Sequence, residues 1–489
     1  MNVGVIVPLI IYLLAMFAVG IYASRHVKKA PQFLQEYFLG GRELGGLLLA
    51  MTIVTTFSSA SSFIGGPGTA YTVGLGWVLL SMTQLVTGYF TLSVLGKKFA
   101  IVARKIEAVT IIDFLKARYE SKWVVILSAI SIVLFLFAAM AAQWIGGGRL
   151  IESITNLPYQ VSLFIFVLAV LVYVTIGGFR AVAITDLIQG IIMFFGTIII
   201  FVAVVYAGGG IESIVDTLKQ ENPNLITPFG ADGTLSKAFV SSFWILVGIG
   251  VVGVPQVVVK AMTYKDSKAM HQAIIIGTVM IGFIMLGMHL IGVFARAIMP
   301  GIEVGDTVMP LITLKVLPDW LAGIVLAAPM AAIMSTVSSL LLMISSTIIK
   351  DVYISYIKPD ISDRQIKHIT MIITAILGLA VFFFVLQPPN LLIWLNLYSF
   401  GGLEAAFIWP IVLGLYWKRG NKYGAIASML VGVLSFILLS LYYPRPLGMH
   451  PVVPAILFSF VAYVTISLLT SHKMKEQQER IIEKFWYVS

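Results

Sequence analysis

Long apolar segments recur along almost the whole chain, and short polar stretches separate them. Each segment is about 20 residues long, which is the length that a helix needs to cross the hydrocarbon core of a bilayer. A membrane β-barrel would instead show short strands with alternating apolar and polar positions. The pattern therefore predicts about 13 transmembrane helices, at 3–24, 45–68, 71–96, 123–148, 158–177, 185–208, 237–259, 271–297, 318–347, 368–387, 391–416, 423–443 and 452–470.

Two of these segments carry residues that interrupt a helix. The stretch Thr55–Gly68 reads TTFSSASSFIGGPG, so a run of hydroxyl side chains leads into a Gly/Pro-rich end. Because Pro removes a backbone donor and clashes with the preceding turn, we expect the helix to be interrupted around Gly65–Gly68. The segment 237–259 is interrupted in a similar way by Gly248, Gly250, Gly253 and Pro255. Non-helical backbone at membrane depth is tolerated only where protein buries it or where it lines a wet cavity.

Interrupted helices at corresponding places in two halves are typical of secondary transporters built from inverted repeats. We therefore predict one all-α integral membrane domain over 1–489, in which two five-helix repeats are inserted in opposite orientations. The predicted parts are an N-terminal extra helix and loop at 1–44, a first repeat at 45–208, a second repeat at 237–416, two extra helices at 423–470 and a cytoplasmic tail at 471–489.

The composition is typical of a membrane protein, and it excludes functions that depend on cysteine. Only 11% of the residues are charged and 59% are hydrophobic, whereas soluble proteins have about 25% charged residues. The chain has no cysteine, which excludes disulfides, thiol catalysis and cysteine metal sites.

The net charge is +10. The Lys and Arg residues are distributed as the positive-inside rule predicts, so the charge does not indicate a nucleic-acid-binding surface. With an outside N-terminus and an odd number of crossings, the C-terminus is cytoplasmic, and most of the 32 Lys and Arg residues fall on the cytoplasmic side. The six on the outer side would be Arg149, Lys219, Lys237, Arg296, Lys315 and Arg445. We therefore expect a multi-pass membrane protein.

A second polar cluster lies in the segment 318–347, at the same predicted depth as the first. Ala332, Ser335 and Thr336 stand at positions i, i+3 and i+4, so they share one face of a helix. Thr55 and Ser58 are likewise three residues apart. Two such faces would offer about five neutral oxygens, and hard cations such as Na⁺ prefer oxygen ligands. The sequence predicts a sodium site between these two segments.

Acidic residues inside the predicted spans are few. Asp186 lies near the inner end of its span, where it either has a function or satisfies a helix start and pairs with Arg180. Glu404 is deeper and costly to bury as an ion, so it is either functional or paired. We expect His289 to be a helix-packing residue. So few carboxylates favour a sodium site of neutral oxygens over a proton relay.

The sequence lacks the motifs of several enzyme classes. There is no GxxxxGK[ST] loop to hold ATP phosphates, and no HExxH or GxSxG motif. We therefore expect a transporter, no enzyme, and no cofactor apart from Na⁺ as coupling ion. A channel or a membrane sensor would keep the same spans and need no cation site, so these classes stay open at this point.

Three further stretches resemble the sodium:solute symporter family, and the likeness extends over about residues 5–470. They are YFLGGRELGG at 37–46, TIGGFRAVAITDLIQ at 175–189 and GLYWKRGNKYGAIASMLVG at 414–432. The resemblance implies a leucine-transporter-like fold, a location in a bacterial plasma (inner) membrane, and alternating access driven by inward Na⁺ flow. It also implies that Thr55, Ser58, Ala332, Ser335 and Thr336 hold sodium, and that Asp186 lies on the sodium path.

Within that family, the motifs are most similar to those of members that take up pantothenate. The stretches that carry this likeness are 59–68, 76–80, 264–278, 326–336 and 393–417. The second interrupted segment has Val247, Val251 and Val252 where some relatives have aromatic residues, and valines suit the geminal methyl groups of pantothenate. Another small carboxylate, or an amino acid such as proline, is the alternative solute. The candidate substrate-binding residues are Ser59, Ser61, Ser62, Gln84, Gln143, Val251, Val252 and Asn396.

Overall fold

The computed structural model describes residues 3–27, 39, 42–233, 235–358 and 360–486. This part of the chain is helical, and an isolated β-bridge joins Leu44 to Tyr264. The α-helices are α1 Val3–Val27, α3 Gly46–Phe57, α4 Gly66–Val73, α5 Leu75–Met82, α6 Thr87–Thr91, α7 Lys97–Lys105, α8 Ile111–Tyr119, α9 Lys122–Thr155, α10 Tyr159–Ala207, α11 Ile211–Glu221, α12 Lys237–Phe243, α13 Pro255–Val258, α14 Ser267–Ile298, α15 Val308–Val316, α16 Asp319–Ser346, α17 Asp363–Phe384, α18 Ile393–Tyr416, α19 Lys422–Tyr442, α20 Val452–Leu469 and α21 Lys475–Trp486. Short 3₁₀ or π turns continue several of them, namely η2 Ser61–Gly65, η3 Thr83–Val86, η4 Leu92–Gly96, η6 Trp244–Ile249, η7 Gly250–Gly253, η8 Val259–Met262, η9 Gly305–Thr307 and η10 Thr347–Ile354.

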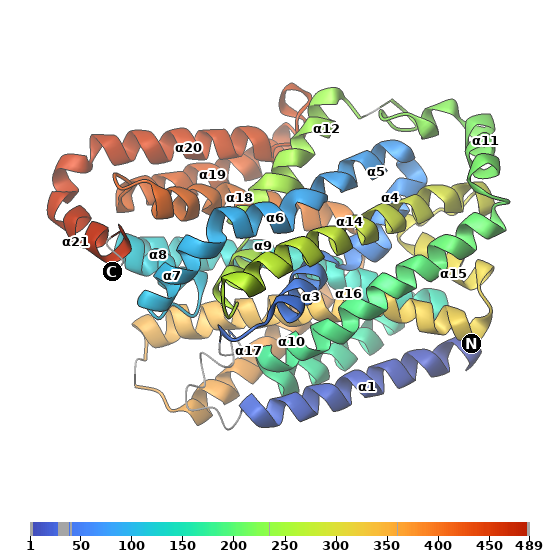
Figure 1. Cartoon of the computed structure of the whole chain (residues 1–489), viewed down its shortest axis with the longest axis horizontal. Helices are drawn as coiled ribbons and strands as arrows, with labels where there is room; N and C mark the ends of the chain where they lie inside the picture. The colour runs from blue at the N-terminus through green and yellow to red at the C-terminus, as the bar shows by residue number, and fades with distance from the viewer. Residues whose placement is uncertain (1–2, 28–38, 40–41, 234, 359, 487–489) are drawn as a thin grey trace.

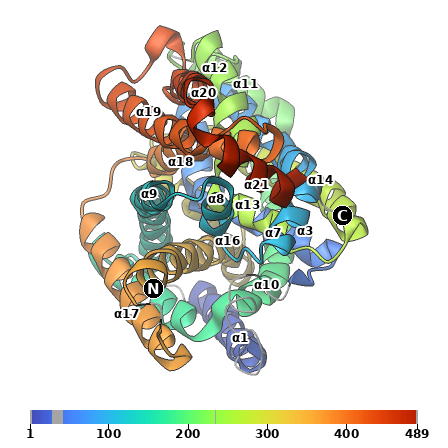
Figure 2. The ribbon, with the colours of Figure 1, turned by 90° about the vertical axis from the view of Figure 1, so that its left-hand side faces the viewer.

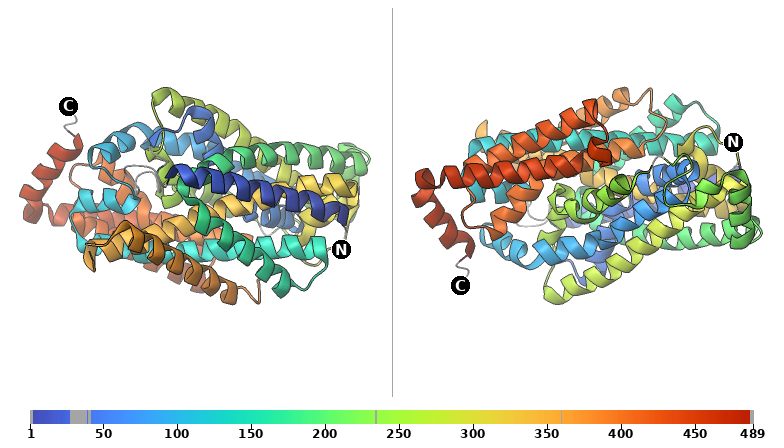
Figure 3. Two further views of the ribbon diagram at one scale, coloured as in Figure 1. Left: turned by 90° about the horizontal axis from the view of Figure 1, so that it is seen from below. Right: turned by 90° about the horizontal axis from the view of Figure 1, so that it is seen from above.

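The long helices run roughly along the long axis of the molecule, and the start of α1 and the end of α21 lie at opposite ends of that axis (Figure 1). Seen along the axis, α16 lies in the middle of the bundle, with α19 and α20 at one edge and α1 and α17 at the opposite edge (Figure 2). The two faces in Figure 3 show the same arrangement, with blue α1 and orange α17 on one face and red α20 on the other. The central helix α16 is almost wholly buried, whereas α19 and α20 expose most of their apolar surface, as helices facing lipid do.

Eight helices of the described part are long and apolar enough to cross a membrane, and two bent helix pairs raise that number to ten. Three shorter apolar helices, Val3–Val19, Tyr159–Leu171 and His368–Phe384, lie where the sequence predicts further spans. The all-helical architecture is thus confirmed, and the number of crossings, about 13, stays a prediction.

The first interrupted helix breaks before the position that we expected. α3 ends at Phe57, and Ser58 has extended backbone angles (φ −81°, ψ 108°). Gly65–Gly68, expected as the break, are instead helical within η2 and α4. Pro67 lies in the first turn of α4, where a missing N–H costs nothing. The glycine at 68 serves close packing, because a side chain there would collide with the backbone of Gly305.

The second interrupted helix breaks where the sequence predicts. Its outer part runs from Lys237 through η6 and η7 to Gly253, and Val254 is extended (φ −90°, ψ 110°). The helix then resumes at Pro255. The two breaks bend their helices by similar angles, 62° for the first and 58° for the second.

Helix α10 covers two of the predicted spans. The sequence predicts 158–177 and 185–208 with a turn between them; within Tyr159–Ala207, which is helical throughout, Tyr159–Leu171 is a shorter apolar helix and Thr185–Ala207 is long and apolar enough to cross a membrane. The stretch contains no proline, and its two adjacent glycines lower helix stability without ending a helix. The side chains of 172–184, including the predicted Asp186 partner Arg180, lie outside the described part of the structure.

The C-terminal residues form a helix, α21, that packs against one end of the bundle. Phe485 is buried and makes an edge-to-face contact with Phe114 of α8, with ring centroids 5.8 Å apart. The Lys98 amino group and the Arg118 guanidinium both lie over the Trp486 ring, at 4.8 and 5.3 Å from its centroid. The charged tail thus covers the loop between α7 and α9.

Arg118, in α8, connects that helix to the end of α18. The side chain is 1% exposed, and its guanidinium donates hydrogen bonds of 2.7, 3.2 and 3.0 Å to the carbonyls of Gly414, Trp417 and Gly420. These carbonyls end a helix, where the partial negative charge of the helix dipole favours a cation.

At the opposite end of the bundle, Asp306 in η9 fixes the start of α18. Its carboxylate is buried and accepts a hydrogen bond of 3.0 Å from the backbone N–H of Leu392. Burial raises the pKa of this carboxyl group to about 7, although the Leu392 hydrogen bond and the charge of Arg149 oppose the shift. The folded protein therefore keeps the proton on Asp306 at pH values where an unfolded chain has lost it.

We expect Arg118→Met to destabilise the protein strongly, because it removes three hydrogen bonds from a buried cation at once. The expected loss is about 2–4 kcal/mol, measured by denaturation of the purified protein in detergent. Lys418→Met is the control, since Lys418 is an exposed cation in the same region. Equal midpoints for the two variants would contradict the assigned role.

We expect the stability of the wild-type protein to fall as pH rises from about 4 to 7, because the folded state holds a proton on Asp306 that the unfolded state releases. Asp306→Asn keeps an acceptor for Leu392 and removes the titration, so its melting temperature should fall less over this range. The matched control is Glu303→Gln, at an exposed position in the same loop. If Asp306→Asn and the wild type show the same pH profile, the buried proton is not on Asp306.

Candidate functional site

The break after α3 leaves two carbonyl oxygens without backbone donors. In a continuous helix, the N–H groups of Ser59 and Ser62 would bond the carbonyls of Thr55 and Ser58. Here the Ser59 N–H instead donates to the Ser62 hydroxyl at 3.4 Å, and the Ser62 N–H donates to the Ser59 carbonyl at 3.0 Å. The carbonyls of Thr55 and Ser58 are therefore available to other groups.

Two hydroxyls of α16 lie directly opposite these carbonyls. The Ser335 hydroxyl is 3.3 Å from the carbonyl oxygen of Thr55, and the Thr336 hydroxyl is 3.3 Å from that of Ser58. Both hydroxyls also approach the Ala332 carbonyl, at 3.0 and 2.9 Å. The five residues predicted from depth and spacing thus meet in one buried cluster of five neutral oxygens.

The spacing within this oxygen cluster suits a hard cation of moderate radius. Ca²⁺, which is close to Na⁺ in size, binds oxygens at about 2.3–2.6 Å, so ligands at right angles lie about 3.3–3.7 Å apart. The two carbonyl–hydroxyl distances between the helices lie at the short end of that range. Among the described residues, no group of three or more His, Cys, Asp or Glu side chains could hold a metal ion.

A cavity lies on the other side of the same break and has a volume of about 460 Å³. Five of the predicted substrate-binding residues line it, namely Ser59, Ser61, Ser62, Gln84 and Asn396. The remaining lining residues are Phe57, Trp77, Ser81, Phe243, Val247, His289, Ile393, Leu397 and Phe400.

Three predicted substrate-binding residues do not line this cavity. Gln143 lies behind the break, where its side-chain oxygen accepts a 2.8 Å hydrogen bond from the backbone N–H of Ala60. Val251 and Val252 are buried in η7, and the neighbouring Gly253 lies against the backbone of Ile408 in α18. These three residues support the walls of the two breaks, and Val247 is the valine that reaches the cavity.

The sequence reasoning missed the aromatic residues at one end of this cavity. The Trp77 ring makes edge-to-face contacts with Phe243 and Trp394, with centroids 5.7 and 5.8 Å apart. Trp77 precedes the cavity-lining Ser81 by one helical turn, and both Trp77 and Phe243 line the cavity. Trp77 stands in the stretch 76–80 that carried the resemblance, but only its contacts with α12 and α18 reveal this role.

His289 also lines the cavity, although the sequence suggested only helix packing. Its Nδ1 lies 2.7 Å from the carbonyl of Met285. A carbonyl only accepts hydrogen bonds, so Nδ1 carries the proton and Nε2 is the acceptor in the neutral ring. A side chain at Gly66 would collide with this ring, so the glycine allows α4 and α14 to approach.

Two buried acidic residues have different surroundings. Asp186 is buried near Thr52, Thr55 and Lys260, but no hydrogen bond joins its carboxylate to another described residue. Lys260 is a nearby charge that the sequence did not suggest. Glu404 is fully buried, and its oxygens have no hydrogen-bond partner among the described residues. It lies next to Gly250 at the second break.

Comparisons with known proteins show the family to which the chain is similar. The model of the sodium:solute symporter family matches residues 37–432. The sodium/pantothenate symporter of Haemophilus influenzae is 47% identical over 484 residues, which is 98% of this chain and 99% of the relative. The sodium/pantothenate symporter of Escherichia coli K12 is 48% identical over 466 residues, which is 95% of this chain and 96% of the relative.

A solved structure of a Na⁺-coupled sialic acid symporter, in a substrate-bound outward-open state, shares the fold. It superposes with a TM-score of 0.78 at 21% sequence identity and covers 95% of this chain and 98% of the other. This likeness confirms the predicted all-α, leucine-transporter-like fold.

Proposed function

The chain belongs to the sodium:solute symporter family, and from this premise we propose that it carries pantothenate into a bacterial cell by coupling uptake to inward Na⁺ flow. It is a transporter and not an enzyme, with Na⁺ as coupling ion. The observation that carries the proposal is the position of the first helix break. Ser58 offers its carbonyl to the oxygen cluster on one side, and the next residue, Ser59, lines the solute cavity on the other.

Na⁺ binds, in this proposal, between the end of α3 and the middle of α16. Its ligands are the carbonyls of Thr55, Ser58 and Ala332 and the hydroxyls of Ser335 and Thr336. The ion would replace the long hydrogen bonds that now connect the two helices. Na⁺ binding thereby fixes the distance between α3 and α16, and Asp186 stands beside the route by which the ion leaves.

Pantothenate occupies the cavity of about 460 Å³. The hydroxyls of Ser59, Ser61 and Ser62 and the amides of Gln84 and Asn396 bind its hydroxyl, amide and carboxylate groups. Val247 packs on its geminal methyl groups, and the Trp77–Phe243 pair covers it. Gln143, Val251 and Val252 act indirectly, by holding the backbone of the two breaks.

Transport follows from thermodynamic linkage between the two sites. Because Na⁺ and pantothenate use neighbouring residues of one break, each ligand orders the segment that the other binds, and each raises the affinity of the other by the same factor. Rigid-body movement of the two predicted repeats, 45–208 and 237–416, then exposes the shared site to either side of the membrane.

The protein lies in the plasma membrane with its N-terminus outside and its C-terminus in the cytoplasm. Two features support this orientation. The start of α1 and the end of α21 lie at opposite ends of the bundle (Figure 1), and the loops assigned to the cytoplasm carry most of the 32 Lys and Arg residues.

We expect labelled pantothenate to accumulate against its gradient in proteoliposomes that contain only this protein, when Na⁺ is higher outside. Uptake should collapse when K⁺ replaces Na⁺, because the solute cannot be concentrated without the ion gradient. Na⁺-driven accumulation of proline, but not of pantothenate, by folded protein would assign the alternative solute.

We expect Ser335→Ala and Thr336→Ala each to raise the Na⁺ concentration for half-maximal uptake by about tenfold, which corresponds to about 1.4 kcal/mol for one ligand oxygen. Ser338→Ala is the matched control, because the buried Ser338 hydroxyl bonds only the Met334 carbonyl, at 2.8 Å, among the described residues. Equal effects of all three substitutions would exclude this sodium site.

A further inference from the structure

Glu404 is a buried acid that the proposed mechanism does not use. It lies in α18, its side chain is fully buried, and neither carboxyl oxygen has a hydrogen-bond partner among the described residues. It lies against the second helix break, since a side chain at Gly250 of η7 would come within 2.5 Å of its Oε2 atom. The extended residue of that break, Val254, follows one turn later. A movement of the second break therefore changes the surroundings of the Glu404 carboxyl group.

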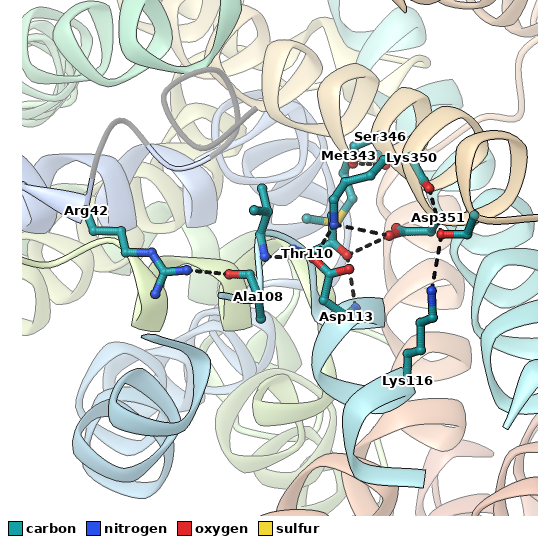
Figure 4. A network of polar contacts seen from close by, with 11 residues as sticks. Arg42, Ala108, Thr110, Asp113, Lys116, Met343, Ser346, Lys350 and Asp351 are labelled. Carbon is teal, nitrogen blue, oxygen red and sulfur yellow. Dashed lines mark hydrogen bonds and ion pairs between the residues drawn. The ribbon is translucent and has the colours of Figure 1, made fainter. Parts of the chain in front are cut away.

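Two other buried acids show how this protein satisfies a carboxylate. Asp351 belongs to the polar network of Figure 4, where it accepts a 2.8 Å hydrogen bond from the Thr110 hydroxyl and lies 3.8 Å from the Lys350 amino group. Asp306 accepts a hydrogen bond from a backbone N–H group. In the part of the chain that the structure describes, Glu404 has neither a donor nor a cation of this kind.

The elements that pack on α18 bring no compensating charge to Glu404. The segments η2, η6 and η7 contain no titratable residue, and α20 contains only Tyr463. The titratable residues of α18 itself and of the other packed helices are Tyr398 and Tyr416 of α18, Asp113, Lys116, Arg118 and Tyr119 of α8, Lys122, Arg149 and Glu152 of α9, and Lys422, Tyr423 and Tyr442 of α19. None of these groups acts on the Glu404 carboxyl group, whose environment is dominated by burial. An ionised carboxylate without a partner is costly inside a protein and at membrane depth, so this carboxyl group is protonated in the structure.

The position of Glu404 connects its proton to the solute cavity. Asn396, Phe400 and Glu404 follow one another at intervals of four residues along one side of α18, and the first two line the cavity. On the facing segment, Val247 lines the same cavity and Gly250 lies against Glu404. Glu404 thus lies one helical turn beyond the cavity wall, and the second break borders both the cavity and the acid.

Separation of η7 from α18 changes the state of this acid. When the two segments move apart, water reaches the carboxyl group, and a Glu side chain in water is ionised above about pH 4.3. Closure returns the group to surroundings in which the ionised form is costly, so a proton must be bound first. Opening and closing of the second break are thereby linked to the release and uptake of one proton.

We propose that Glu404 is a proton-binding site of the second helix break, and that one proton is bound whenever η7 packs on α18. This inference rests on the proposed function, which supplies the movement of the second break. Na⁺ is then held at the first break and H⁺ at the second, and both breaks border the solute cavity. A proton needs no shell of oxygen ligands, which suits a carboxyl group without polar neighbours.

The first test follows the closure of the second break without measuring transport. The chain has no cysteine, so Ile408→Cys introduces a single thiol at the buried α18 position that lies against Gly253. The rate at which a thiol reagent labels it reports the separation of η7 from α18. Labelling is compared with and without Glu404→Gln, since ionisation of the thiol itself contributes equally to both. With Glu404 present, the relative rate should rise by up to about tenfold per pH unit between about pH 6 and 9, because closure takes up one proton.

Na⁺-driven pantothenate uptake by the full-length protein in proteoliposomes is the second measurement. Uptake by the wild type should fall as pH rises over the same range, because the protonated form that permits closure becomes scarcer. Uptake by Glu404→Gln, whose side chain stays neutral, should fall less. Asp319→Asn is the matched control, because this acid is exposed at the start of α16, and its profile should equal that of the wild type.

Identical pH profiles of labelling with and without the Glu404 carboxyl group would overturn the proposal. A relative labelling rate that responds to Na⁺ but not to pH would also overturn it, and would assign the carboxylate to a metal cation. If Glu404→Gln does not fold, Glu404→Met removes the acid at a similar side-chain length and takes its place. Failure of the proposed function is seen separately, as absence of Na⁺-driven pantothenate uptake by the wild type, and the labelling test does not depend on the solute.

Discussion

The structure depends on one requirement, that backbone polar groups inside a bilayer must find partners within the protein. At the break at Ser58, several backbone amides and carbonyls lose their partners within the helix. The amides and the carbonyls then find different kinds of partner. Side chains satisfy the amides: Ser62 accepts from Ser59, Gln143 accepts from Ala60, and Ser59 accepts from Ser61. The carbonyls of Thr55 and Ser58 face only the hydroxyls of α16. These carbonyl oxygens would be costly to leave without a partner inside a bilayer, and they are available to the proposed Na⁺ ion.

The buried helix α16 extends this arrangement along the bundle. Ser335 and Thr336 belong to the oxygen cluster. Thr336 and Ser339 line a small cavity that shares Ser59 and Asn396 with the solute cavity, and Ser339, Met343 and Ser346 line a further cavity. Thr336, Ser339, Met343 and Ser346 follow one another at intervals of three or four residues, so a single face of one helix borders the proposed sodium site and the cavities beside it. A movement of this face relative to α3 therefore affects both sites together.

Buried charges are few in this part of the protein, and their surroundings give each a distinct role. Asp186 is buried near Lys260, whereas Glu404 lies against the second break without a hydrogen-bond partner among the described residues. In the proposed function, neutral oxygens hold the cation, so the oxygen cluster itself stays uncharged when Na⁺ leaves.

The sequence by itself determined the helical membrane fold and the sodium-site candidates, because helix period and membrane depth are local properties. Ala332, Ser335 and Thr336 share a face at any position in a bundle, and their depth follows from the length of their segment. Only the tertiary structure decided that the first helix breaks at Ser58, since Gly65–Gly68 are compatible with a helix start and the partners of the freed amides come from elsewhere. It also decided the burial of Lys260, because hydropathy assigns a lysine at a segment end to a loop. The position of Asp186 near Lys260 depends on packing between segments that are distant in the sequence, and no local pattern encodes it.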